Sequence, residues 1–280
     1  MNSKVLIIIV TYNGSKWVDY CLGSIPNNNN VMSICIDNAS TDDTCDLIES
    51  KYPYVRLIKS ASNLGFGKAN NIGFKAFFEG DYDFALLLNQ DARLEDSCLS
   101  ELTNQMVQNP QYGILSPVHR TENNHQLDYK FGTYLSTSNT PDLLQDLLLK
   151  NPLKPVYEIK FVNAAIWCIS RKCLSVLKQF DPLFPHYGED DEFADRARKE
   201  GFKIGIVPSA LANHARPQVR NRPMTNEEYR ARQFVKLLVK YKARSHKTKF
   251  NNFVFFGRKF FVRLFEEVLF LDSKQVLVLI

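Results

Sequence analysis

The sequence predicts an α/β protein with a mainly parallel, doubly wound sheet, and three observations lead to this fold class. Short unbroken runs of aliphatic and β-branched residues recur, beginning at 5–10, as expected of strands buried on both faces. Segments with apolar residues at helical spacing follow these runs, so strands and helices alternate. Hydrophobic residues are 45% of the 280 and charged residues 23%, a composition that supports a packed core and excludes a disordered chain.

The first hundred residues contain four strand–helix steps. Strands are expected at 5–10, 31–37, 55–58 and 84–88. Helices are expected at 15–25, 41–50 and 67–78, the second capped by Ser40 or Thr41. Parallel strands present their carboxyl ends at one edge of the sheet, where such folds bind ligands. The polar clusters at 11–13, 37–38 and 89–91 are therefore expected to lie together.

The second half of the chain is less regular. The remaining pattern predicts a helix at 95–107, a strand at 113–118, loops with short elements at 120–158, a buried strand at 159–170, a helix at 190–200 and a strand at 203–207. Pro208 is expected to end that last strand, because proline cannot donate a ladder hydrogen bond.

The C-terminal segment differs from the rest in charge. Between Arg216 and Arg263 there are fourteen basic residues and two glutamates, which give this segment a net charge of +12. The whole chain has a net charge of +5, so the remaining residues sum to −7. Two apolar patterns at helical spacing accompany these charges, and the second consists largely of Phe. The sequence thus predicts a helical tail over 216–280 with an anionic partner, either a membrane surface or nucleic acid. Packing on the protein or on a second subunit stays the alternative.

Targeting signals are lacking in this sequence. No run of 18 uncharged apolar residues predicts a transmembrane helix, and the run at 5–10 is too short for a signal-peptide core. Six cysteines, mostly within apolar runs and without a CxxC pair, are typical of reduced buried thiols. We therefore expect a cytoplasmic protein, bound peripherally to the membrane if the tail contacts lipid.

Five strings in a fixed order resemble the inverting family 2 glycosyltransferases with the GT-A fold, in particular their rhamnosyltransferase-like branch. They are IVTYNG (9–14), IDNASTDDT (36–44), NLGFGKANNIG (63–73), LLLNQDA (86–92) and FDPLFPHYGEDDEFADRARKEGFKI (180–204). The resemblance implies sugar transfer from a UDP- or dTDP-sugar to a saccharide or lipid-linked acceptor, in surface polysaccharide biosynthesis. It also implies a catalytic domain over 1–215, with a nucleotide-sugar half at 1–92 and an acceptor half at 93–215.

Asp37 is the candidate for recognising the nucleotide base. A carboxylate at the end of a strand can accept the N3–H of uracil or thymine in a charge-assisted hydrogen bond; capping of the following turn is the alternative. The resemblance places further nucleotide contacts at Thr11, Tyr12, Asn13, Asn63, Lys68, Asn70 and Gln90. Lys68 can equally be a solvated helix lysine, and Asn70 stands where several relatives have arginine.

The segment Asn89-Gln90-Asp91 corresponds to the family's DxD-type metal motif. A divalent cation, Mn²⁺ or Mg²⁺, would neutralise the departing diphosphate. Asparagine replaces the first aspartate, so only Asp91 is anionic. His214 matches the family's late histidine and is expected as a second ligand, which favours Mn²⁺. The alternative for His214 is a loop histidine near Arg216.

Four consecutive carboxylates at 189–192 exceed what a helix N-terminus requires. Inverting transfer needs one base that removes the acceptor hydroxyl proton. The resemblance assigns this role to Asp190, with Asp191 as the second candidate, and like-charge neighbours are expected to raise the pKa of Asp190. The acceptor side is expected to hold Asn163, Trp167 and Tyr187, although Trp167 can instead pack in the core.

Two other functions are each suggested by a specific feature of the sequence. A sugar-phosphate nucleotidyltransferase shares the α/β sheet and a metal aspartate, but it carries a Gly-rich basic loop after the first strand, which residues 11–14 do not provide. A catalytically degenerate scaffold would explain the missing first aspartate, and the intact Asp91 and Asp190 argue against it. No RNA-binding module signature is present, so nucleic acid is excluded from the expected partners. A second copy of the chain, forming a homodimer, is a further expected partner.

Overall fold

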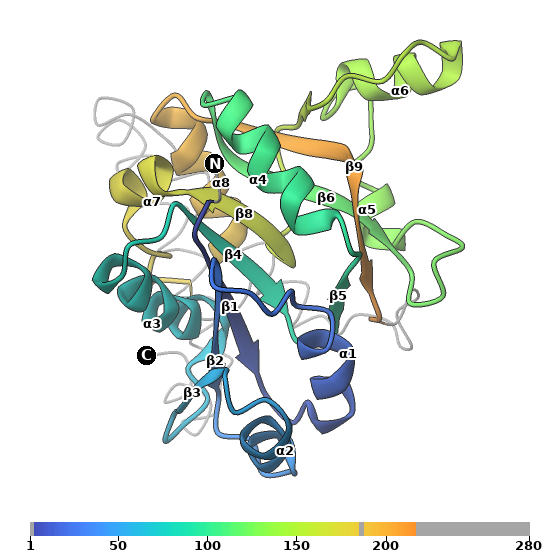
Figure 1. Cartoon of the computed structure of the whole chain (residues 1–280). Coiled ribbons are helices and arrows are strands. Elements are labelled where there is room, and N and C mark those ends of the chain that lie inside the picture. The colour runs from blue at the N-terminus through green and yellow to red at the C-terminus, as the bar shows by residue number, and fades with distance from the viewer. Residues whose placement is uncertain (1–2, 185–187, 217–280) are drawn as a thin grey trace, which may run out of the picture. The chain divides into compact units, whose positions relative to one another are not determined.

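The computed structural model describes residues 3–184 and 188–216, and these residues form one nine-stranded mixed sheet covered by helices (Figure 1). The strand order is β3-β2-β1-β4-β8-β6-β9-β5, and β7 pairs separately with β9. The helices predicted for the C-terminal tail lie outside the described residues.

The N-terminal half of the sheet is parallel, as predicted. It consists of β1 (Val5–Thr11), β2 (Val31–Asp37), β3 (Arg56–Lys59) and β4 (Phe84–Asn89). The register places Thr11 opposite Asp37 and Val10 opposite Asn89. The polar clusters that follow these strands therefore share one edge of the sheet.

Helices cover both faces of this sheet. Alternate residues of each strand point to opposite faces, so each strand contributes apolar side chains to two separate layers. Ile7 of β1 belongs to the apolar cluster that faces α1, α2 and α4, whereas Ile8 belongs to the cluster that faces α3, α7 and α8. The helices are α1 (Val18–Leu22), which follows the 3₁₀ helix η1 (Ser15–Trp17), α2 (Thr44–Lys51), α3 (Gly65–Glu79), α4 (Cys98–Gln108), α7 (Arg171–Leu177) and α8 (Glu189–Lys199).

The second half of the sheet is mixed. Antiparallel β8 (Ile166–Ser170) lies between β4 and β6 (Tyr112–Arg120). The long strand β9 (Lys203–His214) runs parallel to β6 and antiparallel to β5 (Ala92–Leu94) and β7 (Tyr157–Glu158). Two short helices, α5 (Tyr129–Gly132) and α6 (Pro141–Leu149), lie in the long polar connection where short elements were expected.

The prediction that Pro208 ends the last strand is wrong, because β9 continues to His214. Its pairing with β6 shifts register there: Val207 pairs with Pro117, and the next pair is Leu211 with Val118. The residues between Val207 and Leu211 form an irregularity that tolerates a residue without an N–H. The continuation carries His214 to the edge where β4 ends.

Two further predictions need correction. The buried strand expected at 159–170 begins only at Ile166, although the preceding apolar residues are buried. Helix α2 begins at Thr44 and is not capped by Ser40 or Thr41. The Ser40 hydroxyl instead donates to Asp37 Oδ1 at 2.6 Å, so this side chain binds the end of β2 and not the helix.

Gly73 allows α3 to lie close to the central strand β1. A Cβ at this position would lie 2.4 Å from Cγ2 of Ile8, well inside van der Waals contact. Ile8 is fully buried in the cluster beneath α3 and has little room to move. A side chain at position 73 therefore requires the helix to shift from the sheet.

We predict that Gly73→Ala lowers the free energy of unfolding by about 1–3 kcal/mol, the usual cost of overpacking, even though alanine favours a helix over glycine. Urea denaturation measures this change. The matched control is Gly132→Ala in α5, where an added Cβ meets nothing within 4 Å. A Gly73→Ala protein as stable as the parent would contradict the close approach of α3 and β1.

Candidate active site

Asp37 lies at the carboxyl end of β2 and is almost completely buried, with 2% of its surface exposed. Its Oδ1 accepts hydrogen bonds from the Thr11 hydroxyl at 2.9 Å and from the Ser40 hydroxyl, and its Oδ2 accepts from the Ser40 N–H at 2.8 Å. The capping role considered for Asp37 is therefore real. The Cys45 thiol also interacts with this carboxylate. Because a carboxylate has about four lone-pair sites, an imide N–H would take the place of one of these donors.

The ends of β1 and β4 are joined by the side chain of Gln90. The Tyr12 N–H donates to Gln90 Oε1 at 2.9 Å, and Gln90 Nε2 donates to the Tyr12 carbonyl at 3.2 Å. Asn13 has a left-handed backbone (φ 45°), and its Oδ1 accepts from the Thr41 N–H at 2.8 Å. Gln90 thus shapes the loop after β1, and the exposed side chains of Tyr12 and Asn13 are the ones open to a ligand.

The other predicted nucleotide contacts surround the start of α3. Asn63 Oδ1 accepts from the Gly65 N–H at 2.9 Å, and Lys68 is exposed. Asn70 is buried, and its Nδ2 donates to the Phe66 carbonyl at 2.9 Å within the helix. The structure therefore does not bring the Asn70 side chain to a ligand-accessible surface.

Asp91 and His214 are 123 positions apart in the chain, and the β5–β9 ladder brings them together. Ala92 lies opposite His214, and the Ala215 N–H donates to the Asp91 carbonyl at 2.8 Å. As a result His214 Nε2 lies 3.2 Å from Asp91 Oδ1. Burial opposes ionisation of Asp91, but the hydrogen bond and charge of His214 outweigh it and lower the pKa of the carboxyl.

This carboxylate–imidazole pair has the composition of a partial metal site. Within residues 3–184 and 188–216, no group of three or more His, Cys, Asp or Glu side chains is placed to hold a metal ion. One carboxylate and one imidazole suit a divalent cation that takes its other ligands from substrate phosphates and water. The residues thus fit an ion that binds together with a diphosphate.

The four acidic residues at the start of α8 have different environments. Glu192 is buried and forms an ion pair with Arg196 at 2.8 Å, whereas Asp191 is exposed. Asp190 is partly buried; its Oδ1 accepts from the Asp191 N–H at 2.9 Å, and its Oδ2 from the Ala164 N–H at 3.5 Å. The acidic run is therefore not one uniformly solvated helix terminus.

Asp190 is connected to the end of β4 through two consecutive residues. The Ala164 N–H donates to Asp190, and the carbonyl of the next residue, Ala165, accepts from the Asn89 N–H at 2.9 Å. Asn89 is the last residue of β4 and lies two positions before Asp91. The carboxylate at the start of α8 and the carboxylate after β4 thus border the same edge of the sheet.

Burial, and not the neighbouring carboxylates, raises the pKa of Asp190, while backbone hydrogen bonds from Asp191 and Ala164 partly offset this effect. The cause predicted from the sequence is therefore wrong for Asp190. The repulsion acts on Glu189, whose pKa is raised to about 7 by burial first and by the charge of Asp190 second. Glu189 is 8% exposed, and its Oε2 has no hydrogen-bond partner within 3–184 and 188–216.

The structure contradicts the acceptor role considered for Trp167 and does not test the other two predicted acceptor residues. Trp167 is completely buried in β8, 6.0 Å from the ring centre of Phe193, so it packs in the core and cannot stack on a sugar. Asn163 is partly buried, and Tyr187 lies outside the described residues. Sequence reasoning missed Tyr134, whose pKa is raised by burial and then by the charge of Asp190. No motif in the polar connection marks this tyrosine.

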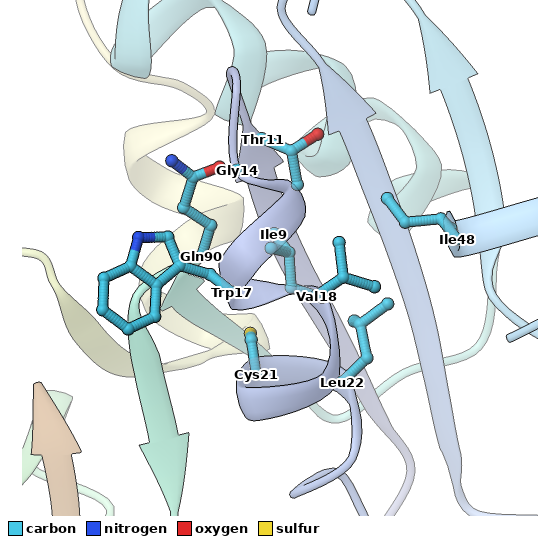
Figure 2. Close-up of a pocket in the computed structure, with 9 residues that line it drawn as sticks. All are labelled: Ile9, Thr11, Gly14, Trp17, Val18, Cys21, Leu22, Ile48 and Gln90. Carbon is cyan, nitrogen blue, oxygen red and sulfur yellow. The ribbon is translucent and has the colours of Figure 1, made fainter. Parts of the chain in front are cut away.

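A small pocket of about 10 Å³ lies next to the loop that follows β1, and Figure 2 shows the residues that line it. Its lining is mostly apolar and consists of Ile9, Thr11, Gly14, Trp17, Val18, Cys21, Leu22, Ile48 and Gln90. Ligand pockets usually enclose about 300–1,000 Å³. Because this pocket is smaller and includes none of Asp37, Asp91 and Asp190, it is a packing gap beside the polar edge.

Polar strand ends at one edge of the sheet, with a carboxylate–imidazole pair beside them, are the arrangement expected of a sugar-transferring enzyme, and comparison with known families supports this class. The family model described as "Glycosyl transferase family 2" matches residues 6–156, more than half of the chain. The chain belongs to this family and is a glycosyltransferase. The match includes Asp37 and Asp91 and ends before Asp190 and His214.

Two curated relatives share parts of the sequence. N-acetylglucosaminyl-diphospho-decaprenol L-rhamnosyltransferase of Mycobacterium tuberculosis is 26% identical over 242 residues, which cover 76% of each chain. The chondroitin synthase of Escherichia coli is 34% identical over 110 residues, covering 36% of this chain and 16% of that enzyme. The predicted resemblance to the rhamnosyltransferase-like branch is thereby confirmed.

Solved glycosyltransferase structures confirm the GT-A fold. GalNAc-T7 with UDP, GalNAc and Mn²⁺ has a TM-score of 0.60 at 15% identity, covering 76% of this chain and 44% of that chain. Staphylococcus aureus TarS 1–349 with UDP-GlcNAc also scores 0.60, at 15% identity and 84% and 66% coverage. The mannosyltransferase PcManGT of Pyrobaculum calidifontis with GDP-Man and Mn²⁺ scores 0.58, at 17% identity and 86% and 63% coverage.

Glu189 predicts a pH dependence of stability. Its folded-state pKa of about 7 exceeds the ordinary value of 4.5, so folding favours the protonated form, and stability falls as pH rises from 4.5 through 7. Glu189→Gln replaces the ionisable carboxyl with a neutral amide, so the variant lacks this pH-dependent loss of stability. Its free energy of unfolding, relative to that of the parent, should rise by up to about 3 kcal/mol between pH 4 and pH 8.

Urea denaturation across this pH range measures the difference. The matched control is Glu200→Gln, at the exposed C-cap of the same helix, which should leave the pH profile unchanged. Parallel profiles for the parent and Glu189→Gln would contradict the raised pKa.

Proposed function

We propose that this glycosyltransferase moves a sugar, with inversion, from a UDP- or dTDP-sugar to a saccharide or lipid-linked acceptor in surface polysaccharide biosynthesis. The observation that carries the proposal is the connection of Asp190 to the end of β4, two residues before Asp91. A base for the acceptor and a charge that faces the leaving group need to flank one reacting carbon, and this connection supports that arrangement.

The donor is proposed to bind along the edge formed by β1, β2 and β4. Asp37 would accept the N3–H of the pyrimidine in place of one of its present donors, with Thr11, Tyr12 and Asn13 beside it. Asp91 and His214 would hold Mn²⁺ or Mg²⁺. When bound, the cation would neutralise the diphosphate as it departs. The UDP and Mn²⁺ bound in GalNAc-T7 support a site of this kind.

Asp190 is proposed as the general base. In its ionised form it would take the proton of the acceptor hydroxyl as that oxygen attacks the anomeric carbon opposite the departing diphosphate, which inverts the configuration. Burial raises its pKa and so increases its basicity. Asp191 is exposed at the same terminus, which makes it the weaker candidate.

The acceptor is proposed to be lipid-linked and to bind on the half of the domain at 93–215. The acceptor named for the mycobacterial relative, a diphospho-decaprenol, supports this. No helix in the described ranges is long and apolar enough to cross a membrane. Independently of that finding, we propose a cytoplasmic enzyme that contacts the membrane surface through the basic tail at 216–280; the tail contact and a homodimer both stay predictions.

We predict that Asp190→Asn lowers the transfer rate by about 10²- to 10⁴-fold, the usual effect of removing a general base, and leaves donor binding unchanged. Release of nucleoside diphosphate measures transfer, and calorimetry measures donor affinity. The matched control is Asp191→Asn, which should stay within a few-fold of the parent.

Two outcomes would contradict this assignment. Near-normal turnover by Asp190→Asn together with an inactive Asp191→Asn would move the base by one residue. Failure of the parent protein to turn over any UDP- or dTDP-sugar, with either Mn²⁺ or Mg²⁺ present, would favour the degenerate scaffold.

A further inference from the structure

We propose that Asp128 is a positioning residue that fixes the ring of His214 for cation binding. Asp128 lies between β6 and α5, outside the acidic and metal motifs of the sequence. The inference rests on the proposed function, because it takes His214 as a ligand of the cation that accompanies the donor diphosphate.

The Asp128 carboxylate is completely buried and is held at several points. Its Oδ1 accepts from the Phe131 N–H at 2.7 Å, which caps α5. Arg216 Nε donates to Oδ2 at 2.8 Å, and Arg216 Nη2 donates to Oδ1. These three donated hydrogen bonds hold the carboxylate in one orientation.

The His214 ring lies between two carboxylates. Its Nε2 is 3.2 Å from Asp91 Oδ1, and its Nδ1 is 4.0 Å from Asp128 Oδ2. Nδ1 is buried and makes no hydrogen bond to the residues that the structure describes; among these, the Asp128 carboxylate is the anionic group placed to stabilise a proton there. The separation is too long for a hydrogen bond, but a charge at this distance acts strongly in a buried site.

A neighbouring histidine completes the surroundings of this ring. His119 is perpendicular to His214, with ring centres 6.2 Å apart, and stacks on Phe131 at 4.7 Å. Burial lowers the pKa of His119 to about 3, so this ring is neutral and brings no charge that competes with Asp128. The His214 ring is thus restrained by an aromatic neighbour on one side and by charged groups at both nitrogens.

Without a cation, Nε2 of His214 faces Asp91 Oδ1 at 3.2 Å. With a cation at Nε2, the proton of the neutral ring lies on Nδ1, the nitrogen that faces Asp128. Histidine ligands of metals commonly have a carboxylate at the second ring nitrogen for this reason. Asp128 would therefore act on cation affinity through His214, without touching the cation or the donor.

A double-mutant cycle on the full chain tests this route. Electron paramagnetic resonance measures Mn²⁺ affinity with saturating UDP in the parent, Asp128→Asn, His214→Ala and the double variant. Asp128→Asn should weaken Mn²⁺ binding by about 10- to 100-fold in the parent. In the His214→Ala background it should change Mn²⁺ affinity by less than about twofold, because the residue it acts through is gone.

The matched control is Asp146→Asn. Asp146 is also a buried carboxylate that accepts hydrogen bonds, from Tyr157 at 2.7 Å and Asn151 at 3.1 Å, and it lies in α6. This variant should leave Mn²⁺ affinity unchanged. Equal losses from Asp128→Asn in the parent and in the His214→Ala background would overturn the inference and assign Asp128 a structural role.

A second measurement needs no substitution that affects folding. Nitrogen NMR of the histidine-labelled parent with Mg²⁺ and UDP should show His214 with its proton on Nδ1, and an Nε2–H tautomer would overturn the inference. Failure of the proposed metal site is a distinct result: His214→Ala would then leave Mn²⁺ affinity unchanged.

Discussion

The parallel register of β2, β1 and β4 is the constraint on which the rest of the structure depends. Thr11 lies opposite Asp37, and Val10 lies opposite Asn89, so the polar residues after the three strands meet at one edge. A shift of one residue would turn Ile7 and Ile8 to the wrong helical layers, and this fixes the register tightly. Core packing thereby determines where the groups proposed to bind the donor lie.

The second half of the domain completes this edge through longer-range pairing. Strand β9 delivers His214 beside Asp91, and residues 164–165 connect Asp190 with the end of β4. These contacts join segments about a hundred positions apart in the chain. The chemistry therefore depends on strands that do not belong to the parallel half, although the family model matches mainly the first half of the chain.

The sequence predicted the parallel strands and their polar edge well, because buried runs and helical spacing are local signals. It did not predict that β9 would pass Pro208, since the compensating irregularity depends on pairing with β6. The locations of Asp91, His214 and Asp190 could be expected only from the resemblance. The cause of the raised pKa of Asp190, the role of Asp128 and the burial of Trp167 arise from tertiary packing, which no local pattern encodes.

The central claim is that this edge binds a pyrimidine nucleoside diphosphate, a choice that the fold alone does not make, because PcManGT shares the fold and holds GDP-Man. Titration calorimetry with UDP, dTDP and GDP in the presence of Mn²⁺ tests it most directly. We expect UDP or dTDP to bind more tightly than GDP, and Asp37→Ala to weaken that binding by about 1.5–3 kcal/mol, the contribution of a hydrogen bond to a charged group. Equal affinity for all three nucleotides, unchanged in Asp37→Ala, would contradict the account.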